Sequence, residues 1–207
     1  MRIRFAKKDS ARFISHLDLV RATGRALKRA GIPVYYTQGF NPHPYLVFSP
    51  PLPVGVTGLC ELLDIRLDRP LSPQSVLDML KGAFPAGLEV QRVYEEVRSF
   101  NEIAYARYQM YFPSEYTEKF SEFIAQDHIC VEKRAKKGRF VQIDLKQEFE
   151  IETAGDGEVT FVLPCGNEKN IGVALFSEAF RGYVCVPELP IGLFRIDFLD
   201  SAKKIFE

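Results

Sequence analysis

The sequence has no long hydrophobic run. Its longest apolar stretches, such as the one that begins at Val173, are far shorter than the roughly 20 residues that cross a bilayer. Met1 leads directly into a charged, strand-like segment and not into the apolar core of a signal peptide. We therefore expect a cytoplasmic protein with no membrane span and no membrane partner.

Cysteine pairs and nucleotide-binding loops are also missing. The four cysteines (Cys60, Cys130, Cys165 and Cys185) lie 70, 35 and 20 residues apart, so no Cys-x-x-Cys pair suggests a zinc knuckle or a redox motif. The chain contains no glycine-rich phosphate loop, no Gly-x-Ser-x-Gly elbow and no dinucleotide fingerprint, which argues against nucleotide hydrolysis and acyl transfer. We expect reduced thiols and no bound cofactor.

What the chain does have is enough apolar sequence for a core and an uneven distribution of charge. Its 207 residues, 46% of them hydrophobic, can form one large or two small domains. The whole chain is neutral, but residues 1–50 hold nine Lys or Arg against two Asp, a net charge of +7. Such a basic end on a neutral protein favours a localised anion-binding face, with an ordinary solvated face as the alternative.

The first half predicts the order strand, helix, strand, strand, helix, strand, with one further strand signal between the two helices. The predicted elements are a strand over 2–7, a helix over 16–30, strands over 34–37, 46–49 and 59–67, a helix from Pro73 to about 84, and a strand over 88–97. Ser15 and Ser72 are the predicted N-caps, and Gly31 with Pro33 ends the first helix. This order is typical of the ferredoxin-like, split βαβ arrangement over residues 1–98.

The second half predicts a similar order over residues 105–207. Its predicted strands are 106–113, 129–134, 140–145, 160–163 and 193–199, and its predicted helices are 114–126 and 168–180. The fold class that we predict is therefore α+β, with two ferredoxin-like domains in tandem whose antiparallel sheets carry their helices on one face.

The helix predicted after Ser15 combines a packing face with a cationic face. Its N-terminus offers free N–H groups and the positive end of the helix dipole, which favours a phosphate or a carboxylate. Gly24 lowers helix propensity by about 1 kcal/mol, which suggests a close approach to the backbone at that point. Arg21, Arg25, Lys28 and Arg29 line its cationic face. The candidate binding residues are Arg12, Arg21, Arg25 and Arg29, which would hold phosphates, together with Ser15, His16, Asp18, Tyr36, Gly39, Asn41, His43 and Glu61.

Two histidines are candidate catalytic groups. Ser15 or Asp18 could orient His16, and Asn41 could orient His43. If the two imidazoles share one cleft, they could act as general acid and base of a metal-independent ribonuclease, with Arg12 or Tyr36 stabilising charge. The alternative is that each imidazole only caps a helix or completes a loop. A metal site could be written from His16, His43, Glu61 and Asp64, but no recognised ligand spacing supports it, so we expect no metal.

A loop rich in proline and aromatic residues follows the first helix. Gly39 is predicted to supply a positive φ or a close approach, and Pro42 and Pro44 stiffen the turn that presents Asn41 and His43. Aromatic groups beside cations suit single-stranded or looped RNA, although aromatic residues at strand spacing are also core residues. The aromatic residues concerned are Tyr35, Tyr36, Phe40 and Tyr45. A second basic cluster, from Lys133 to Arg139, could extend a phosphate track or be a solvated hairpin tip.

Four motifs resemble an uncharacterised bacterial domain family that is associated with radical S-adenosylmethionine proteins, as a separate chain or as a C-terminal extension. The motifs are Arg12-Phe-Ile-Ser-His-Leu-Asp-Leu, Arg25-Ala-Leu-Lys-Arg-Ala, Gly39-Phe-Asn-Pro-His-Pro and Glu61-Leu-Leu-Asp. The resemblance is specific over about 1–98 and weaker beyond Tyr105. Asp9 stands where the family usually has glycine, and Tyr45 where lysine is common. The resemblance implies partnership with a radical S-adenosylmethionine enzyme, but this chain lacks the cysteine triad that would hold the iron–sulfur cluster.

Three functions remain open from the sequence. The first is a non-catalytic accessory module that binds tRNA-like or ribosomal RNA and presents it to the radical enzyme. The second is a metal-independent RNA endonuclease with His16 and His43 as acid and base, by analogy with the duplicated ferredoxin-like nucleases of bacterial defence systems. The third is a protein-only adaptor that docks through the face formed by residues 12–44.

Overall fold

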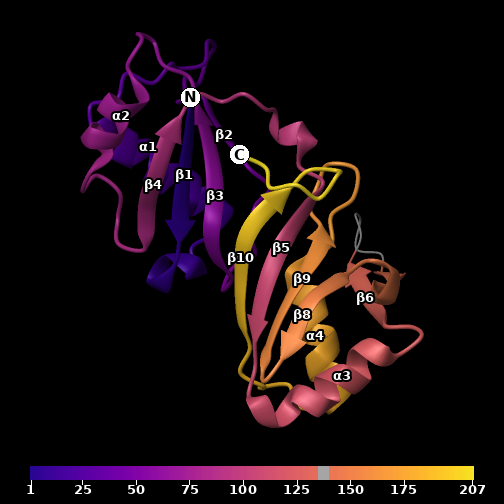
Figure 1. Cartoon of the computed structure of the whole chain (residues 1–207). Helices are drawn as coiled ribbons and strands as arrows, with labels where there is room; N and C mark the ends of the chain where they lie inside the picture. The colour runs from indigo at the N-terminus through magenta and orange to yellow at the C-terminus, as the bar shows by residue number, and fades with distance from the viewer. Residues whose placement is uncertain (135–139) are drawn as a thin grey trace. The chain divides into compact units, whose positions relative to one another are not determined.

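The computed structural model describes residues 1–134 and 140–207 and shows an α+β protein with mostly antiparallel sheets (Figure 1). The described residues form four α-helices. None of these helices is long and apolar enough to cross a membrane. Contacts between Cα atoms divide the chain into two units, unit 1 (Met1–Phe100) and unit 2 (Asn101–Glu207).

Unit 1 contains four strands in the order β4-β1-β3-β2, and each neighbouring pair is antiparallel. Ser72 caps the second helix and Pro73 is its first residue, as the sequence predicts. The elements are β1 (Arg2–Lys7), the 3-10 helix η1 (Asp9–Phe13), α1 (His16–Arg29), β2 (Leu46–Phe48), β3 (Thr57–Ile65), α2 (Pro73–Leu80) and β4 (Leu88–Tyr94).

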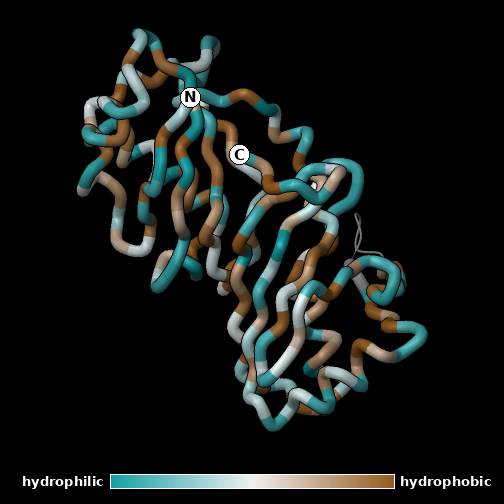
Figure 2. The backbone as a smooth tube through the Cα atoms, in the orientation of Figure 1, coloured by the Kyte–Doolittle hydropathy of each residue, from teal (hydrophilic) through white to brown (hydrophobic). Residues whose placement is uncertain are grey.

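Both helices of unit 1 pack on the same core. Ile3 and Phe5 of β1 are almost fully buried, and in the sequence they alternate with Arg2 and Arg4. Figure 2 shows hydrophobic and hydrophilic residues alternating along the strands. This period of two is what places one face of a strand on the core. The core joins strand and helix residues, namely Ile3, Phe5, Leu63, Ile65, Leu19, Leu27, Val76 and Leu80. The helices therefore cover one face of this sheet.

The strand predicted over 34–37 is wrong. That segment makes only isolated bridges, Val34 with Leu67 and Tyr36 with Pro44. The second strand of unit 1 in chain order is instead β2, which pairs Leu46 with Ile65 of β3. Proline explains the difference, because Pro42 and Pro44 have no N–H to donate and leave the preceding segment without a continuous ladder partner.

Unit 2 contains four strands in the order β10-β5-β9-β8 and a separate two-stranded sheet of β6 and β7. Each neighbouring pair is again antiparallel. The elements are β5 (Tyr105–Tyr111), α3 (Thr117–Ala125), β6 (Cys130–Arg134), β7 (Phe140–Asp144), β8 (Glu150–Gly155), β9 (Glu158–Pro164), α4 (Val173–Val184) and β10 (Gly192–Leu199). Three further 3-10 helices are Phe100–Glu102, Ser114–Tyr116 and Leu145–Gln147.

The sequence assigns the middle strands of unit 2 incorrectly. The segments 129–134 and 140–145 do form strands, but β6 and β7 pair with each other as a hairpin. The two strands between the helices that join the main sheet are β8, which the sequence does not predict, and β9. Five of the six residues of β8 are exposed, because it is an edge strand, so it lacks the apolar alternation that identifies a half-buried strand. The last helix begins at Val173 and not at Glu168.

Phenylalanine dominates the core of unit 2 between its helices and its sheet. Neighbouring ring centroids lie between 4.4 and 6.3 Å apart, mostly in edge or tilted geometry. Such separations are favourable for aromatic pairs. The rings are those of Phe112, Phe120, Phe123, Phe161, Phe176 and Phe180.

A contact between His128, two residues before β6, and Asp144, the last residue of β7, connects the two strands of the β6–β7 hairpin. Asp144 Oδ2 lies 2.7 Å from His128 Nδ1, and Asp144 Oδ1 accepts a hydrogen bond from Ile129 N at 2.9 Å. The hydrogen bond and the charge of Asp144 raise the pKa of His128 above its ordinary value of 6.5. The His128–Asp144 contact therefore stabilises the folded hairpin fully below about pH 6.5, and that contribution disappears as the pH rises through the folded pKa.

We expect the His128 ring to titrate above pH 6.5 in the folded protein, and Asp144→Asn to return its midpoint to the ordinary range. The measurement is the pH dependence of the His128 ring proton shifts by NMR. His43, which the structure places in another loop, is the internal reference. Identical midpoints for His128 in the wild type and the variant would contradict the assigned contact.

Candidate functional site

The N-terminus of α1 is capped as the sequence predicts. Ser15 Oγ accepts a hydrogen bond from Asp18 N at 3.1 Å and donates one to Asp18 Oδ2 at 2.7 Å. This pair satisfies one of the free donors of the first turn. Ser15 and Asp18 therefore position the helix, and the Asp18 carboxylate is already engaged.

The exposed face of α1 is cationic. Arg21, Arg25 and Lys28 are exposed there. Among the described residues, Arg21 alone of these three has an acidic partner, since its guanidinium lies 3.4 Å from the Asp18 carboxylate. Arg29 differs from the other three, because its guanidinium donates to the carbonyl of Ala83 at 2.6 Å. Arg29 thus fastens α1 to the segment after α2, while the other three side chains present their charge to solvent.

The segment after α1 forms a closed loop. Tyr45 N donates to Tyr35 O at 2.8 Å, and Thr37 N donates to His43 O at 2.9 Å. His43 N donates back to Thr37 Oγ1 at 3.2 Å, and its ring Nδ1 lies 3.1 Å from Asn41 O. The same ring nitrogen also lies 3.0 Å from Thr37 Oγ1, so the imidazole contacts two other residues of the loop. His43 therefore has a structural role in holding this loop, which we call the aromatic loop (residues 35–45).

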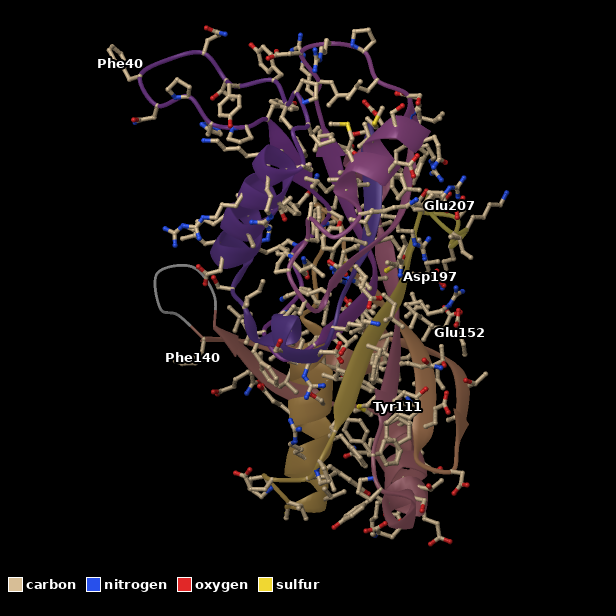
Figure 3. The ribbon with its side chains drawn as sticks, turned by 90° about the vertical axis from the view of Figure 1, so that its left-hand side faces the viewer. Phe40, Tyr111, Phe140, Glu152, Asp197 and Glu207 are labelled. Atoms are coloured by element: carbon tan, nitrogen blue, oxygen red, sulfur yellow. The ribbon has the colours of Figure 1, made fainter. Side chains whose placement is uncertain are left out.

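Phe40 lies at the tip of the aromatic loop and is fully exposed, at 105% relative accessibility. Figure 3 shows its ring pointing away from the ribbon. Gly39 precedes it with φ +127°, a backbone conformation that only glycine adopts without strain, as the sequence predicts. Tyr36 and Tyr45, each 43% exposed, stand at the base of the loop.

The aromatic loop returns onto α1 at Gly24. Pro44 Cγ lies 3.9 Å from the position that a Cβ of Gly24 would occupy. Pro44 does approach the helix here, but this distance is ordinary van der Waals contact, so glycine is not required for space. The contact places the base of the loop beside the cationic face of α1.

We expect Gly24→Ala to raise the free energy of unfolding by about 0.5–1 kcal/mol, because alanine has the higher helix propensity and its methyl group fits against Pro44. Urea unfolding followed by circular dichroism measures the change. The matched control is Gly87→Ala, whose Cβ would lie 2.6 Å from the carbonyl oxygen of Lys8 and should destabilise the protein. A loss of stability in Gly24→Ala would contradict the contact with Pro44.

The structure does not bring His16 and His43 together. His16 packs edge-on against Phe48, with ring centroids 5.4 Å apart, at the first turn of α1. The aromatic loop meets the same helix at Gly24, eight residues further on, which corresponds to roughly 12 Å along the axis at about 1.5 Å per residue. This placement gives no support to the predicted acid–base pair.

Glu61 lies near His16 and away from the aromatic loop. Both line a small pocket with Lys7 and Ser49, and Glu61 is only 4% exposed. The Glu61 carboxylate occupies the space that a Cβ of Gly58 would need, at 2.4 Å from Oε1. Asp64 is engaged elsewhere by Arg2, and the described residues contain no cluster of three metal-ligating side chains.

Arg12 stands at the start of the site. Its guanidinium lies over the ring of Phe13 at 4.7 Å, and its Nε has no hydrogen-bond partner among the described residues. Its carbonyl accepts from Gly55 N at 2.8 Å. The sequence does not reveal that Phe13 is exposed or that Lys7 is almost fully buried. A bulge between Phe5 and Lys7 turns the lysine inward, and no sequence signal marks that bulge.

The sheet of unit 2 carries charges that pair with one another. Arg107 donates to both carboxylate oxygens of Glu152 at 2.7 and 2.8 Å and to Asp197 at 2.9 Å (Figure 3). The hydrogen bonds to Glu152 are the main reason that the pKa of Arg107 is raised. Gln109 donates to Glu158 at 2.8 Å beside them. This arginine is therefore not available to a polyanion. Residues 135–139 of the second basic cluster, which runs from Lys133 to Arg139, lie outside the described residues.

Comparison with known proteins places the chain in a family. Residues 1–172 match the family model described as an uncharacterized protein conserved in bacteria (DUF2344). The chain belongs to this family. The match covers all of unit 1, including α1 and the aromatic loop, and ends at the residue before α4. The candidate site is thus a feature of the DUF2344 region of the chain.

No curated protein matches this DUF2344 chain. Among solved structures it is similar to an unknown protein from Galdieria sulphuraria, with 15% identity and a TM-score of 0.29 over 94% of this chain and 96% of that one. It is also similar to a "putative glycine cleavage system transcriptional repressor", with 14% identity and a TM-score of 0.22 over 97% and 96%. Both TM-scores are too low to establish a shared fold.

Proposed function

We propose that this DUF2344 chain is a non-catalytic accessory module that binds RNA, tRNA-like or ribosomal, and presents it to a radical S-adenosylmethionine enzyme. The observation that carries the RNA part is the aromatic loop beside the cationic face of α1. Phe40 offers an exposed ring at the tip of the loop, and Arg21, Arg25 and Lys28 offer positive charge on the helix that the base of the loop contacts. Rings that stack on bases and cations that neutralise phosphates are the two requirements for binding single-stranded RNA.

We also propose that each unit is a ferredoxin-like domain. Without the β6–β7 hairpin, both units have the element order strand, helix, strand, strand, helix, strand. In both, the strands lie in the order fourth, first, third, second. These two regularities support the assignment, and in this fold the helices lie on one face of the sheet.

The radical enzyme as partner is proposed from the sequence motifs that span α1 and the aromatic loop. The chain has no closely spaced cysteine triad, so the cluster chemistry would belong to the partner. A presenting module needs only to hold RNA on one surface and the enzyme on another. That division of roles agrees with a site in which the imidazoles of His16 and His43 are held apart in separate structural contacts.

The proposal is tested by the salt dependence of binding to a labelled single-stranded RNA pool. Because each cation that contacts phosphate releases counterions, we expect the logarithm of affinity to fall steeply with the logarithm of salt concentration. Arg25→Ala and Lys28→Ala should each reduce that slope by about one. Arg107→Ala in unit 2 is the matched control and should leave the slope unchanged. No affinity at low salt would rule out the RNA function.

The same RNA pool distinguishes the endonuclease. A nuclease would cleave the RNA, and His16→Ala or His43→Ala would abolish cleavage while leaving binding intact. We expect no cleavage by the wild type. Cleavage that depends on both histidines would show that the chain is an endonuclease and not a non-catalytic presenting module.

A further inference from the structure

Three large apolar side chains are exposed together at the start of α1. Phe13, Leu17 and Val54 are 59%, 57% and 59% exposed. The hydrogen bond from Gly55 N to Arg12 O joins the turn that carries Val54 to the residue before Phe13. Leu17 lies in the first turn of α1, four residues after Phe13, with the extended residues Ile14 and Ser15 between them. We call these three residues the apolar patch, and it does not overlap the aromatic loop.

The backbone under the apolar patch is held rigidly. Lys7, which is 1% exposed, donates from Nζ to the carbonyl of Ile14 at 3.0 Å, between η1 and α1. Ile14 N donates to Ala11 O at 3.2 Å, and Ser15 caps the helix. A surface that is already ordered loses little conformational entropy on binding, which favours a binding function for its exposed apolar groups.

The charges around the apolar patch are suited to an acidic partner. Arg12 covers one side of Phe13, and the positive end of α1 lies beneath Leu17. Asp18, the nearest acidic group on the helix, is engaged by Ser15 and Arg21. Asp9 stands at the far end of η1, four residues from Phe13. Among the described residues, Arg12 is therefore the charged side chain that contacts the patch and is free to pair with a carboxylate.

Aliphatic residues distinguish the partner from RNA. Leu17 and Val54 have no ring on which a base can stack, whereas clustered apolar anchors with a charged rim are typical of protein interfaces. We propose that the apolar patch docks an acidic segment of a partner protein, in which apolar side chains contact Phe13, Leu17 and Val54 and a carboxylate pairs with Arg12. This inference deepens the proposed function, since it gives the presenting module a protein-binding surface separate from its RNA surface.

The test is a selection of random peptides displayed on phage against the immobilised full-length chain. We expect the selected peptides to combine apolar residues with Asp or Glu. Their affinity should fall roughly tenfold or more in the Leu17→Ser/Val54→Ser double variant. Val97→Ser, a change at a valine that is 90% exposed outside the patch, is the matched control and should bind like the wild type. Since the three side chains are exposed, circular dichroism should show that all variants fold.

Several outcomes would overturn the docking surface. They are a selection without an acidic, apolar consensus, equal binding of the peptides by the double variant, and loss of RNA affinity in the double variant. If the wild-type chain self-associates and the double variant does not, the patch binds a second copy of this chain and not an acidic partner. RNA binding is measured separately. The Arg25→Ala variant should have a lower affinity for RNA and an unchanged affinity for the peptides. If the peptides bind and RNA does not, the docking surface stands and the RNA function fails.

Discussion

Phe40→Ala is expected to weaken the binding of single-stranded RNA by roughly ten- to a hundredfold, because stacking of one base on an aromatic side chain contributes about 1–3 kcal/mol. Phe40 is fully exposed at the tip of the aromatic loop, so its ring supports no core. The hydrogen bonds that close the loop, between Thr37 and His43, do not involve its side chain. The variant should therefore lose affinity and keep its stability.

The measurement is fluorescence anisotropy with a labelled RNA at fixed salt, together with urea unfolding of the same protein. Tyr111→Ala is the matched control, since Tyr111 is an aromatic residue of unit 2 that is 39% exposed and lies outside both basic clusters. Replacing it should leave affinity unchanged. If Phe40→Ala binds RNA as tightly as the wild type, the aromatic loop is not a stacking surface, and the cationic face of α1 would have to bind RNA by charge alone.

Arg2→Ala is expected to lower the free energy of unfolding of unit 1 by roughly 3 kcal/mol or more, because removing one partner of a buried ion pair leaves the other uncompensated. The Arg2 side chain is 0% exposed and donates to both oxygens of Asp64, at 2.7 and 2.8 Å. It also donates to the carbonyl of Arg98 at 2.7 Å and lies over the Phe100 ring at 4.2 Å. One guanidinium thus ties β1 to β3 and to the end of unit 1.

The pKa of Arg2 supports this assignment. Burial by itself lowers the pKa of this group, but the hydrogen bond and charge of Asp64 outweigh it, so the pKa is raised from an already high ordinary value. Arg2 therefore stays charged at every pH at which the protein is folded.

Urea unfolding by circular dichroism, with hydrogen exchange of the β1 amides to isolate unit 1, measures the effect of Arg2→Ala. Arg25→Ala is the control, because an exposed arginine should change stability by no more than about 0.5 kcal/mol. Arg2→Lys should give an intermediate loss, since lysine keeps the charge and loses the two-pronged geometry. Equal stability of Arg2→Ala and Arg25→Ala would show that the buried pair does not hold unit 1 together.

Local sequence signals predicted the elements that depend on local physics. The cap at Ser15 and the proline at the first position of α2 are chemical signals that each act within about one helical turn, and both helices begin where those signals place them. Gly39 was predicted from its neighbours to supply a positive φ or a close approach, and it has the positive φ. The signals failed for β8, because an exposed edge strand has no burial to shape its composition.

The sequence by itself determined the α+β class, the position of α1, the basic end of the chain and the aromatic residues after α1. The tertiary structure alone decided which of these residues act together. It separated His16 from His43, engaged Arg29 with Ala83, buried Lys7 through a bulge, and left Phe40 and the apolar patch exposed. The physical reason is that periodicity and capping act over a few residues, whereas burial and pairing depend on segments that are distant in the chain and meet only in the fold.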